Sequence, residues 1–149
     1  MSKKSKILIA DRNRHVREFI MREMAAEGYQ CRPSKSAWEV LNTLMEEGPI
    51  DMLILDLDLP GVKEIDLLKI IERERPTLPI IFHSLLSDYI TNQPPRMRMA
   101  AFVEKDGNSI KDIKKIVSHI LGHVPEQVTN HMGGKNALAK ETSNNEEIL

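Results

Sequence analysis

Four polar side chains that could do chemistry together each follow a short apolar run of the sequence. Asp56 follows the run 52–55 and precedes the turn residues Pro60 and Gly61. An acid at the end of a buried strand lies at the edge where open α/β sheets hold ligands, although a strand-end aspartate can also do no more than initiate a turn. The other three are Asp11, Ser84 and Lys105, which follow the runs 7–10, 80–82 and 100–103.

These four residues, here called the strand-end row, have the chemistry of phosphate transfer. Two neighbouring carboxylates, Asp11 and Asp56, would repel each other unless a proton or a hard cation lies between them. Mg²⁺ suits such a pair because it binds one or two carboxylates together with waters and a phosphate oxygen. A carboxylate so placed can attack phosphorus to form an aspartyl phosphate, while Lys105 and Ser84 donate to the phosphoryl oxygens. Each of these two donors alone could equally be an ordinary loop lysine or turn hydroxyl, so it is their joint placement that favours phosphate chemistry.

Five short strands, alternating with five helical segments, would position the row. The uninterrupted apolar run 52–55 is typical of a strand buried on both faces of a parallel sheet. The alternation predicts an α/β, flavodoxin-like, doubly wound fold with a five-stranded parallel sheet, strand order 2-1-3-4-5 and helices on both faces. In that order the strands that precede the row are neighbours. The predicted strands are 7–10, 29–32 (ended by Pro33), 52–55, 79–82 and 100–103.

The helices are indicated by apolar spacing and by capping residues. Asn13 is the expected N-cap of the first helix, and Ser36 with Glu39 has the spacing of a capping box for the second. Apolar residues over 65–71 predict the third helix. Pro94 and Pro95 predict a short or displaced fourth helix, because proline breaks a helix interior. A fifth helix runs to Gly122, so residues 6–122 are expected to fold and residues 123–149 to form a flexible polar tail.

The composition excludes several classes of protein. The 149 residues carry a formal net charge of -1, which gives no overall attraction to nucleic acid or to an anionic membrane. Cys31 is the single cysteine, so an intrachain disulfide is impossible and a reducing compartment is expected. No apolar run is long enough for a membrane span or a signal peptide, which predicts a cytoplasmic location.

The chain resembles the response-regulator receiver domains of two-component signalling from Lys6 to about Leu121. The resemblance rests on the strand-end row, on Leu59-Pro60-Gly61 after Asp56, and on Phe102 in the fifth strand. It implies that Asp56 is the phosphoacceptor, Ser84 the switch hydroxyl, Phe102 the switch aromatic and Lys105 the phosphate-binding lysine.

The resemblance also implies a cofactor, partners and a mode of action. The implied Mg²⁺ ligands are Asp11, Asp56 and the backbone carbonyl of Asp58. The implied function is that of a non-enzymatic phosphorelay module, which accepts phosphate from a histidine kinase or phosphotransfer protein and signals to a downstream protein by changing its interaction surface.

Two departures from the family pattern leave alternatives open. Arg12 stands where receivers usually carry a second acid, and Leu85 where a small residue usually leaves room for the phosphoryl group. We expect Arg12 to weaken Mg²⁺ binding without abolishing it, because its long side chain can turn outward. One alternative is a pseudo-receiver, a protein-binding module in which Arg12 neutralises Asp56. Another alternative is the receiver half of a transcription regulator whose DNA-binding part is missing. About 27 residues follow Gly122, too few for a DNA-binding domain, so this alternative requires a truncated chain. No direct contact with nucleic acid is therefore expected from this chain.

Overall fold

A computed structural model of the protein describes residues 4–46, 48–92, 94 and 100–122. The predicted tail 123–149 and the stretch 95–99 lie outside the described residues. The chain divides into two units, Met1–Ile116 and Val117–Leu149. The first unit contains the whole sheet, and of the second the structure describes only the end of the last helix and Gly122.

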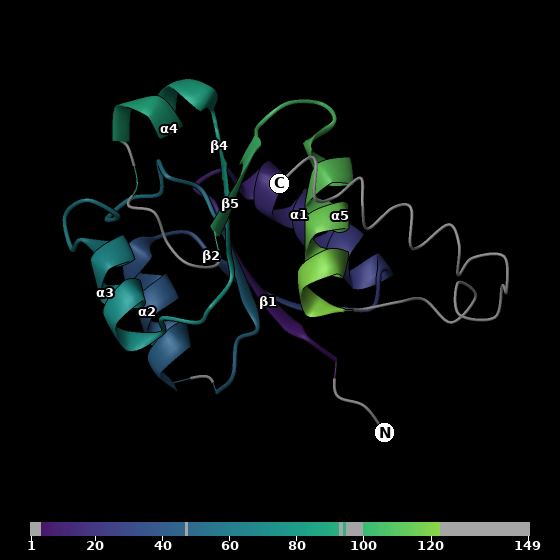
Figure 1. Ribbon diagram of the computed structural model, residues 1–149, viewed down its shortest axis with the longest axis horizontal. Coiled ribbons are helices and arrows are strands. Elements are labelled where there is room, and N and C mark those ends of the chain that lie inside the picture. Colours follow the sequence, from purple (N-terminus) through teal and green to yellow (C-terminus); the bar gives the residue numbers. More distant parts are fainter. Residues whose placement is uncertain (1–3, 47, 93, 95–99, 123–149) are drawn as a thin grey trace, which may run out of the picture. The chain divides into compact units, whose positions relative to one another are not determined.

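The sheet of the first unit is parallel, with the strand order β2-β1-β3-β4-β5 (Figure 1). This confirms the predicted flavodoxin-like fold and strand order. Within the first unit, α2 and α3 cover one face of the sheet, and α1 and the start of α5 cover the other (Figure 1). The strands are β1 (Lys6–Ala10), β2 (Gln30–Ser34), β3 (Met52–Leu55), β4 (Ile80–Ser84) and β5 (Ala100–Glu104). The helices are α1 (Arg14–Ala26), α2 (Ala37–Glu46), α3 (Leu67–Glu74), α4 (Leu86–Asn92) and α5 (Ser109–Leu121).

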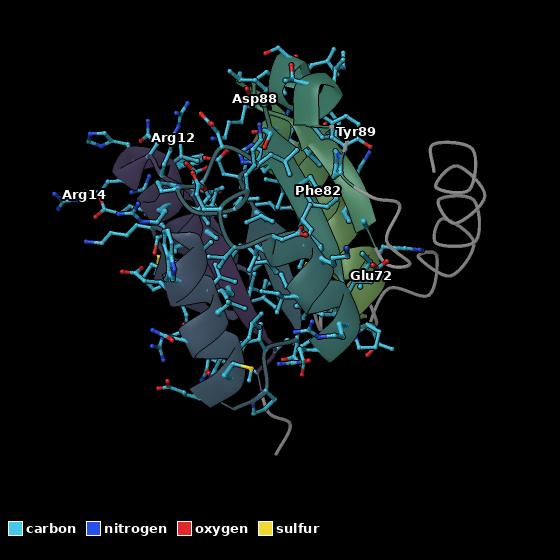
Figure 2. The ribbon with its side chains drawn as sticks, turned by 90° about the vertical axis from the view of Figure 1, so that its left-hand side faces the viewer. Arg12, Arg14, Glu72, Phe82, Asp88 and Tyr89 are labelled. Carbon is cyan, nitrogen blue, oxygen red and sulfur yellow. The ribbon has the colours of Figure 1, made fainter. Side chains whose placement is uncertain are left out.

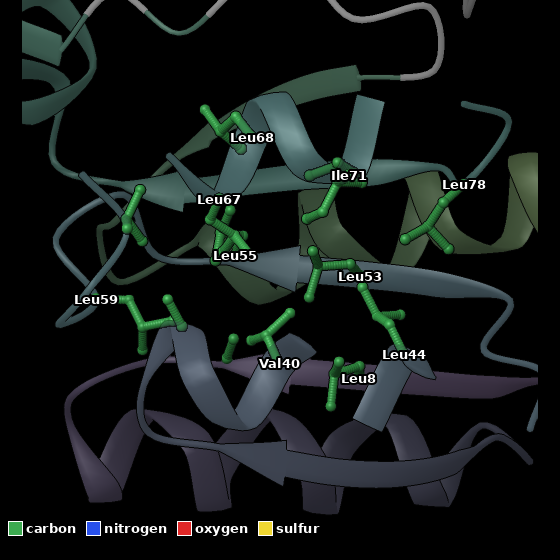
Figure 3. Close-up of a cluster of buried hydrophobic side chains, with 14 of the residues drawn as sticks. Leu8, Val40, Leu44, Leu53, Leu55, Leu59, Leu67, Leu68, Ile71 and Leu78 are labelled. Carbon is green, nitrogen blue, oxygen red and sulfur yellow. The ribbon is translucent and has the colours of Figure 1, made fainter. Parts of the chain in front are cut away.

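Strand β3 is buried on both faces, as its unbroken apolar run predicts. Leu53 and Leu55 are fully buried and belong to a cluster between the sheet and the α2 and α3 side (Figure 3). Met52 and Ile54 are equally buried but lie outside that cluster, because side chains alternate between the two faces of a strand. Burying each such side chain contributes roughly 1.5–3 kcal/mol, so the two faces together fix the position of Asp56 at the strand's end.

Strand β2 differs from the prediction that it ends at Pro33. It runs from Gln30 to Ser34, and Pro33 stands in register with Ile9 of β1. Proline has no backbone N–H to donate, whereas a central strand is hydrogen-bonded to a neighbouring strand on each side. Because β2 is an edge strand with only β1 as a neighbour, its missing donor can face away from the sheet.

The starts of α1 and α2 confirm Asn13 and Ser36 as the predicted cap residues. The Asn13 side chain accepts hydrogen bonds from the backbone N–H groups of His15 and Val16 at the start of α1. Glu39 N–H donates to Ser36 Oγ at the start of α2, although the Glu39 carboxylate accepts from Lys35 rather than from the cap residue.

Helix α3 begins at Leu67, later than the apolar pattern over 65–71 predicts. Asp66 has a left-handed backbone with φ of 53°, and turns fill residues 57–66. The chain therefore stays irregular after Asp56 for longer than the hydrophobic spacing alone indicates.

Helix α4 is short, as Pro94 and Pro95 predict. It spans seven residues and ends at Asn92. Tyr89 anchors it to the sheet, because its ring centroid lies 4.3 Å from that of Phe102 and 6.5 Å from that of Phe82. Figure 2 shows Tyr89 and Phe82 on the same side of the sheet. None of the helices in the described part of the chain combines the length and the apolar character that crossing a bilayer requires.

Candidate functional site

The ends of strands β1, β3 and β5 bring two carboxylates and an ammonium group together, although β4 lies between β3 and β5 in the sheet. Lys105 Nζ lies 2.9 Å from Asp11 Oδ2 and 3.4 Å from Asp56 Oδ2. The side chains of Asp11 and Asp56 are only 3% and 1% exposed, whereas that of Lys105 is 19% exposed. One lysine therefore bridges two buried acids, so Asp11, Asp56 and Lys105 of the strand-end row are gathered as the fold was expected to gather them.

Backbone N–H groups surround the two carboxylates. Asn13 N–H donates to Asp11 Oδ1 at 2.8 Å, and Asp58 N–H donates to Asp56 Oδ1 at 3.0 Å. Arg12 N–H lies at 3.4 Å from Asp56 Oδ2. Both oxygens of Asp56 and one oxygen of Asp11 thus face N–H groups of the loops after β1 and β3, while the other oxygen of Asp11 contacts Lys105, and these contacts orient the carboxylates before any ligand arrives.

Burial and charge act against each other at Asp11. Its pKa is raised above the ordinary value, first because burial disfavours the charged form and also because Asp56 lies beside it. The hydrogen bond from Asn13 and the ammonium of Lys105 oppose this rise. The charged form of Asp11 is thus disfavoured by burial and by Asp56, and both Asn13 N–H and Lys105 stabilise it.

Ser84 lies at the end of β4, fully buried beside the loop that follows Asp56. Its Oγ accepts a hydrogen bond of 2.7 Å from Leu57 N–H, and its carbonyl accepts one of 2.9 Å from Lys105 N–H. A serine hydroxyl that accepts in this way still has its own proton to donate. Ser84 is therefore tied both to the residue after Asp56 and to the residue that bridges the acids.

Phe102 packs against α4 instead of standing alone at the sheet edge. Tyr89 is its partner, and the sequence reasoning did not identify Tyr89 as part of this region. The only signal was an aromatic residue in an otherwise irregular segment. Leu85, which was expected to crowd the site, has a side chain 46% exposed, and its carbonyl accepts from Tyr89 N–H at the start of α4.

Arg12 takes neither of the two positions considered for it. Its guanidinium forms an ion pair with the carboxylate of Asp58, so it does not neutralise Asp56 and does not turn freely into solvent. The side chains of Arg12 and Asp58 are 53% and 45% exposed. Figure 2 shows Arg12 and Arg14 at the end of the molecule where α1 begins. The sequence predicted a role only for the backbone carbonyl of Asp58, and its side-chain partner was missed.

A second buried polar pair was also missed. His83 Nε2 lies 3.0 Å from Ser109 Oγ, which joins β4 to the first residue of α5. Burial lowers the pKa of His83 to about 4, and the nearby Lys105 acts in the same direction. The imidazole is therefore neutral at pH 7, and its hydrogen bond to Ser109 joins β4 to α5.

The oxygen ligands of the site are of the kind that suits Mg²⁺. Asp11 and Asp56 turn towards one common cation position, at present shared with Lys105, and their mutual repulsion favours added positive charge. The expected third ligand, the Asp58 carbonyl, is an oxygen of the right kind. However, no group of three or more histidine, cysteine or acidic side chains suited to a metal occurs among the described residues, and Arg12 adds a positive charge nearby.

Comparisons with known proteins agree with this geometry. The family model for the response regulator receiver domain matches residues 7–118. The DNA-binding transcriptional regulator NtrC of Proteus hauseri is 35% identical over 85 residues, covering 57% of this chain and 18% of that protein. NtrC of a Bradyrhizobium strain is 28% identical over 124 residues, covering 83% of this chain and 26% of that protein. The chain thus spans about a quarter, or less, of the length of these relatives.

Solved structures show the same architecture. The response regulator TrrA of Thermotoga maritima, solved in complex with Mg²⁺ and BeF, has a TM-score of 0.67 and 25% identity, with 78% of this chain and 98% of that chain covered. The receiver domain of the hybrid histidine kinase CckA has a TM-score of 0.62 and 28% identity, with 78% and 99% covered. With the family model matching most of the folded residues, the chain belongs to the response regulator receiver domains of two-component systems.

Proposed function

We propose that this receiver domain accepts a phosphoryl group on Asp56 and passes the signal on through a phosphorylation-dependent change of its surface. Receiver domains are signalling modules that interact with histidine kinases or phosphotransfer proteins. The observation that carries the proposal is the shared contact of Lys105 with Asp11 and Asp56 at the carboxyl edge of a parallel sheet. That edge is where folds of this kind hold ligands.

The transfer needs no redox partner, and it takes up a proton only where the leaving group is a histidine nitrogen, because an acyl donor leaves as a carboxylate. A carboxylate oxygen of Asp56 attacks phosphorus and forms an O–P bond. The bond from phosphorus to the donor, a histidine nitrogen or an acyl oxygen, breaks, and the donor leaves with the electron pair. Lys105 already lies 3.4 Å from Asp56 and can donate to a phosphoryl oxygen, and Ser84 can add its hydroxyl proton. Asp11 holds Lys105 in place.

Receiver domains generally bind Mg²⁺ at the phosphorylation site. In this chain we propose Asp11, Asp56 and the Asp58 backbone carbonyl as its ligands, with an affinity weakened by Arg12. When bound, the ion would neutralise charge on the phosphoryl oxygens. The TrrA structure, which was solved with Mg²⁺ and BeF, supports this assignment by analogy.

The output is proposed to run through Ser84 and Phe102. Ser84 Oγ is bonded to Leu57 N–H, so a phosphoryl group that recruits this hydroxyl would compete with the bond. Helix α4 follows two residues later and rests on Phe102 through Tyr89. A movement of Ser84 would therefore act on the α4 surface.

The test is intact-mass measurement of the full chain after incubation with acetyl phosphate and Mg²⁺. We expect an added mass of one phosphoryl group, lost in Asp56→Asn and retained in the control Asp112→Asn, which removes an exposed acid of α5. A phosphate that persists in Asp56→Asn would contradict the assignment. The absence of any phosphate on the wild-type chain would contradict it as well.

A second candidate is that the domain is the receiver part of a longer transcription regulator, which the NtrC relatives favour. It would share the chemistry above and differ only in output. The pseudo-receiver alternative has less support, because Arg12 pairs with Asp58 rather than with Asp56. The domain limits 6–122, the polar tail 123–149 and the cytoplasmic location stay predictions from the sequence.

A further inference from the structure

Arg12 brings a second cation to the Asp56 site from the solvent side. Its backbone N–H lies 3.4 Å from Asp56 Oδ2, and its guanidinium is paired with Asp58, two residues after Asp56. Lys105 approaches the same carboxylate with a side chain only 19% exposed, against 53% for Arg12. Lys105 therefore contacts Asp56 directly from the less exposed part of the site, whereas the guanidinium of Arg12 stays on Asp58, beside Asp56 in the more exposed part.

Asp58 holds the guanidinium at this place. Asp58 N–H donates to Asp56 Oδ1, which fixes the loop after β3 against the acid. The Asp58 carboxylate forms an ion pair with the guanidinium of Arg12, which belongs to the loop after β1. The ion pair thus joins the two loops that flank Asp56, and because both partners are about half exposed, it is weak and can exchange partners readily.

Phosphorylation increases the need for positive charge at this site. Before it, the carboxylates of Asp11, Asp56 and Asp58 face two cations. Afterwards the single charge of Asp56 is replaced by a phosphoryl group that carries up to two. A guanidinium offers five donors in a planar fork that matches phosphate oxygens, so Arg12 can keep Asp58 and still bind, or can exchange one for the other.

We propose that Arg12 is a phosphate-binding residue of this site, which binds the phosphoryl group on Asp56 from its more exposed position beside Asp58 and thereby reduces the dependence of phosphorylation on Mg²⁺. The proposal rests on the proposed phosphorylation of Asp56. It differs from the idea that Arg12 merely weakens the metal site, because it gives the guanidinium a positive contribution to the reaction. It also explains why Asp58 offers its carboxylate to Arg12.

The test follows phosphorylation of the full chain by acetyl phosphate, measured as intact mass over time, in excess EDTA and in Mg²⁺. We expect the wild type to be phosphorylated in EDTA, and Arg12→Gln to be slowed roughly tenfold or more there, the loss typical of one charge-assisted hydrogen bond. Arg12→Lys should fall between the two, because it keeps the charge and loses the fork. Arg14→Gln, which removes an arginine of the same segment that is paired with Glu18, should match the wild type.

A second measurement does not depend on phosphorylation. Mg²⁺ is titrated into the unphosphorylated wild type and into Arg12→Asp, with the fluorescence of Trp38, whose ring covers Gly61 in the loop after Asp56, as the signal. We expect Arg12→Asp to bind Mg²⁺ at least roughly tenfold more tightly, as an added carboxylate ligand should, and to need Mg²⁺ for phosphorylation. Equal binding by both proteins would place Arg12 away from the site and overturn the proposal.

The remaining outcomes separate this inference from the proposed function. Arg12→Gln reacting in EDTA as fast as the wild type, or faster, would overturn the inference and leave Asp56 as phosphoacceptor. The same holds for a wild type that reacts only with Mg²⁺. If neither the wild type nor Arg12→Asp takes up phosphate under any condition, the proposed function itself fails.

Discussion

Replacing Lys105 with methionine should destabilise the folded domain, because it leaves two buried acids facing each other. Methionine preserves most of the apolar stem and removes only the ammonium, which lies 2.9 Å from Asp11 and 3.4 Å from Asp56. Removing one partner of a buried ion pair costs about 3–5 kcal/mol. Since the lysine side chain is 19% exposed, we expect the lower end, about 3 kcal/mol in the free energy of unfolding at pH 7.

The size of this loss should depend on pH in a defined direction. The pKa of Asp11 is already raised above its ordinary value of 3.8, and the loss of Lys105 removes a group that lowers it. A folded pKa above the unfolded one means that the contribution of Asp11 to stability is fully present below about pH 3.8 and is lost as the pH rises through the folded pKa. The destabilisation by Lys105→Met should therefore shrink as the pH falls from 7 towards 4.

Urea unfolding of the wild type and Lys105→Met at pH 7 and pH 4.5 measures both effects. Lys111→Met, which alters an exposed lysine of α5, is the control and should change stability by less than about 0.5 kcal/mol. The double variant Lys105→Met with Asp11→Asn should recover most of the loss, because only one of the two buried carboxylates remains. A loss below about 1 kcal/mol at pH 7, or one equal at both pH values, would refute the claim that Lys105 holds two repelling acids together.

Three further predictions concern the surroundings of the site. Backbone amides of α4 should exchange faster than those of β3 in hydrogen-exchange mass spectrometry, because a seven-residue helix has few internal bonds to lose; equal protection would contradict this. Gly61→Ala should cost about 1–2 kcal/mol and shift the fluorescence of Trp38, since Gly61 has φ of 92° and a Cβ there would clash with the indole; an unchanged spectrum would count against that contact. Burial lowers the pKa of His83 to about 4, so its stabilising contribution is present above about pH 6.5 and is lost as the pH falls towards 4. His83→Asn should therefore flatten the decline of stability between these two pH values; an imidazole of His83 that titrates near pH 6.5 by NMR would disprove this prediction.

The strand-end row was predictable because each of its members follows an apolar run. Once the alternation of strands and helices fixed a parallel sheet, the carboxyl ends had to meet at one edge. Strand order brings Asp11 and Asp56 side by side, whereas the contact of Lys105 with them also needs its long side chain to reach past the end of β4. The end of β2 was mispredicted for a related reason, because the sequence does not reveal that Pro33 lies on an edge strand.

The contacts that were missed depend on side chains that reach across loops. The partner of Arg12 is decided by the turn geometry after β3, where Asp58 N–H bonds to Asp56 and so turns its own carboxylate towards the loop after β1. The pairing of Tyr89 with Phe102 depends on where the short helix α4 comes to rest. Neither leaves a periodic signal in the sequence, because each joins one residue to one distant residue.

Ser84 connects these loop contacts to the surface that would carry the signal. Its hydroxyl accepts from Leu57 N–H, its carbonyl accepts from Lys105 N–H, and α4 starts two residues later. A phosphoryl group on Asp56 that attracts both the hydroxyl and Lys105 would act on the two sides of Ser84 at once. Since Tyr89 packs α4 against Phe102 and Phe82, those ring contacts are the point at which a small shift of Ser84 would change the exposed surface.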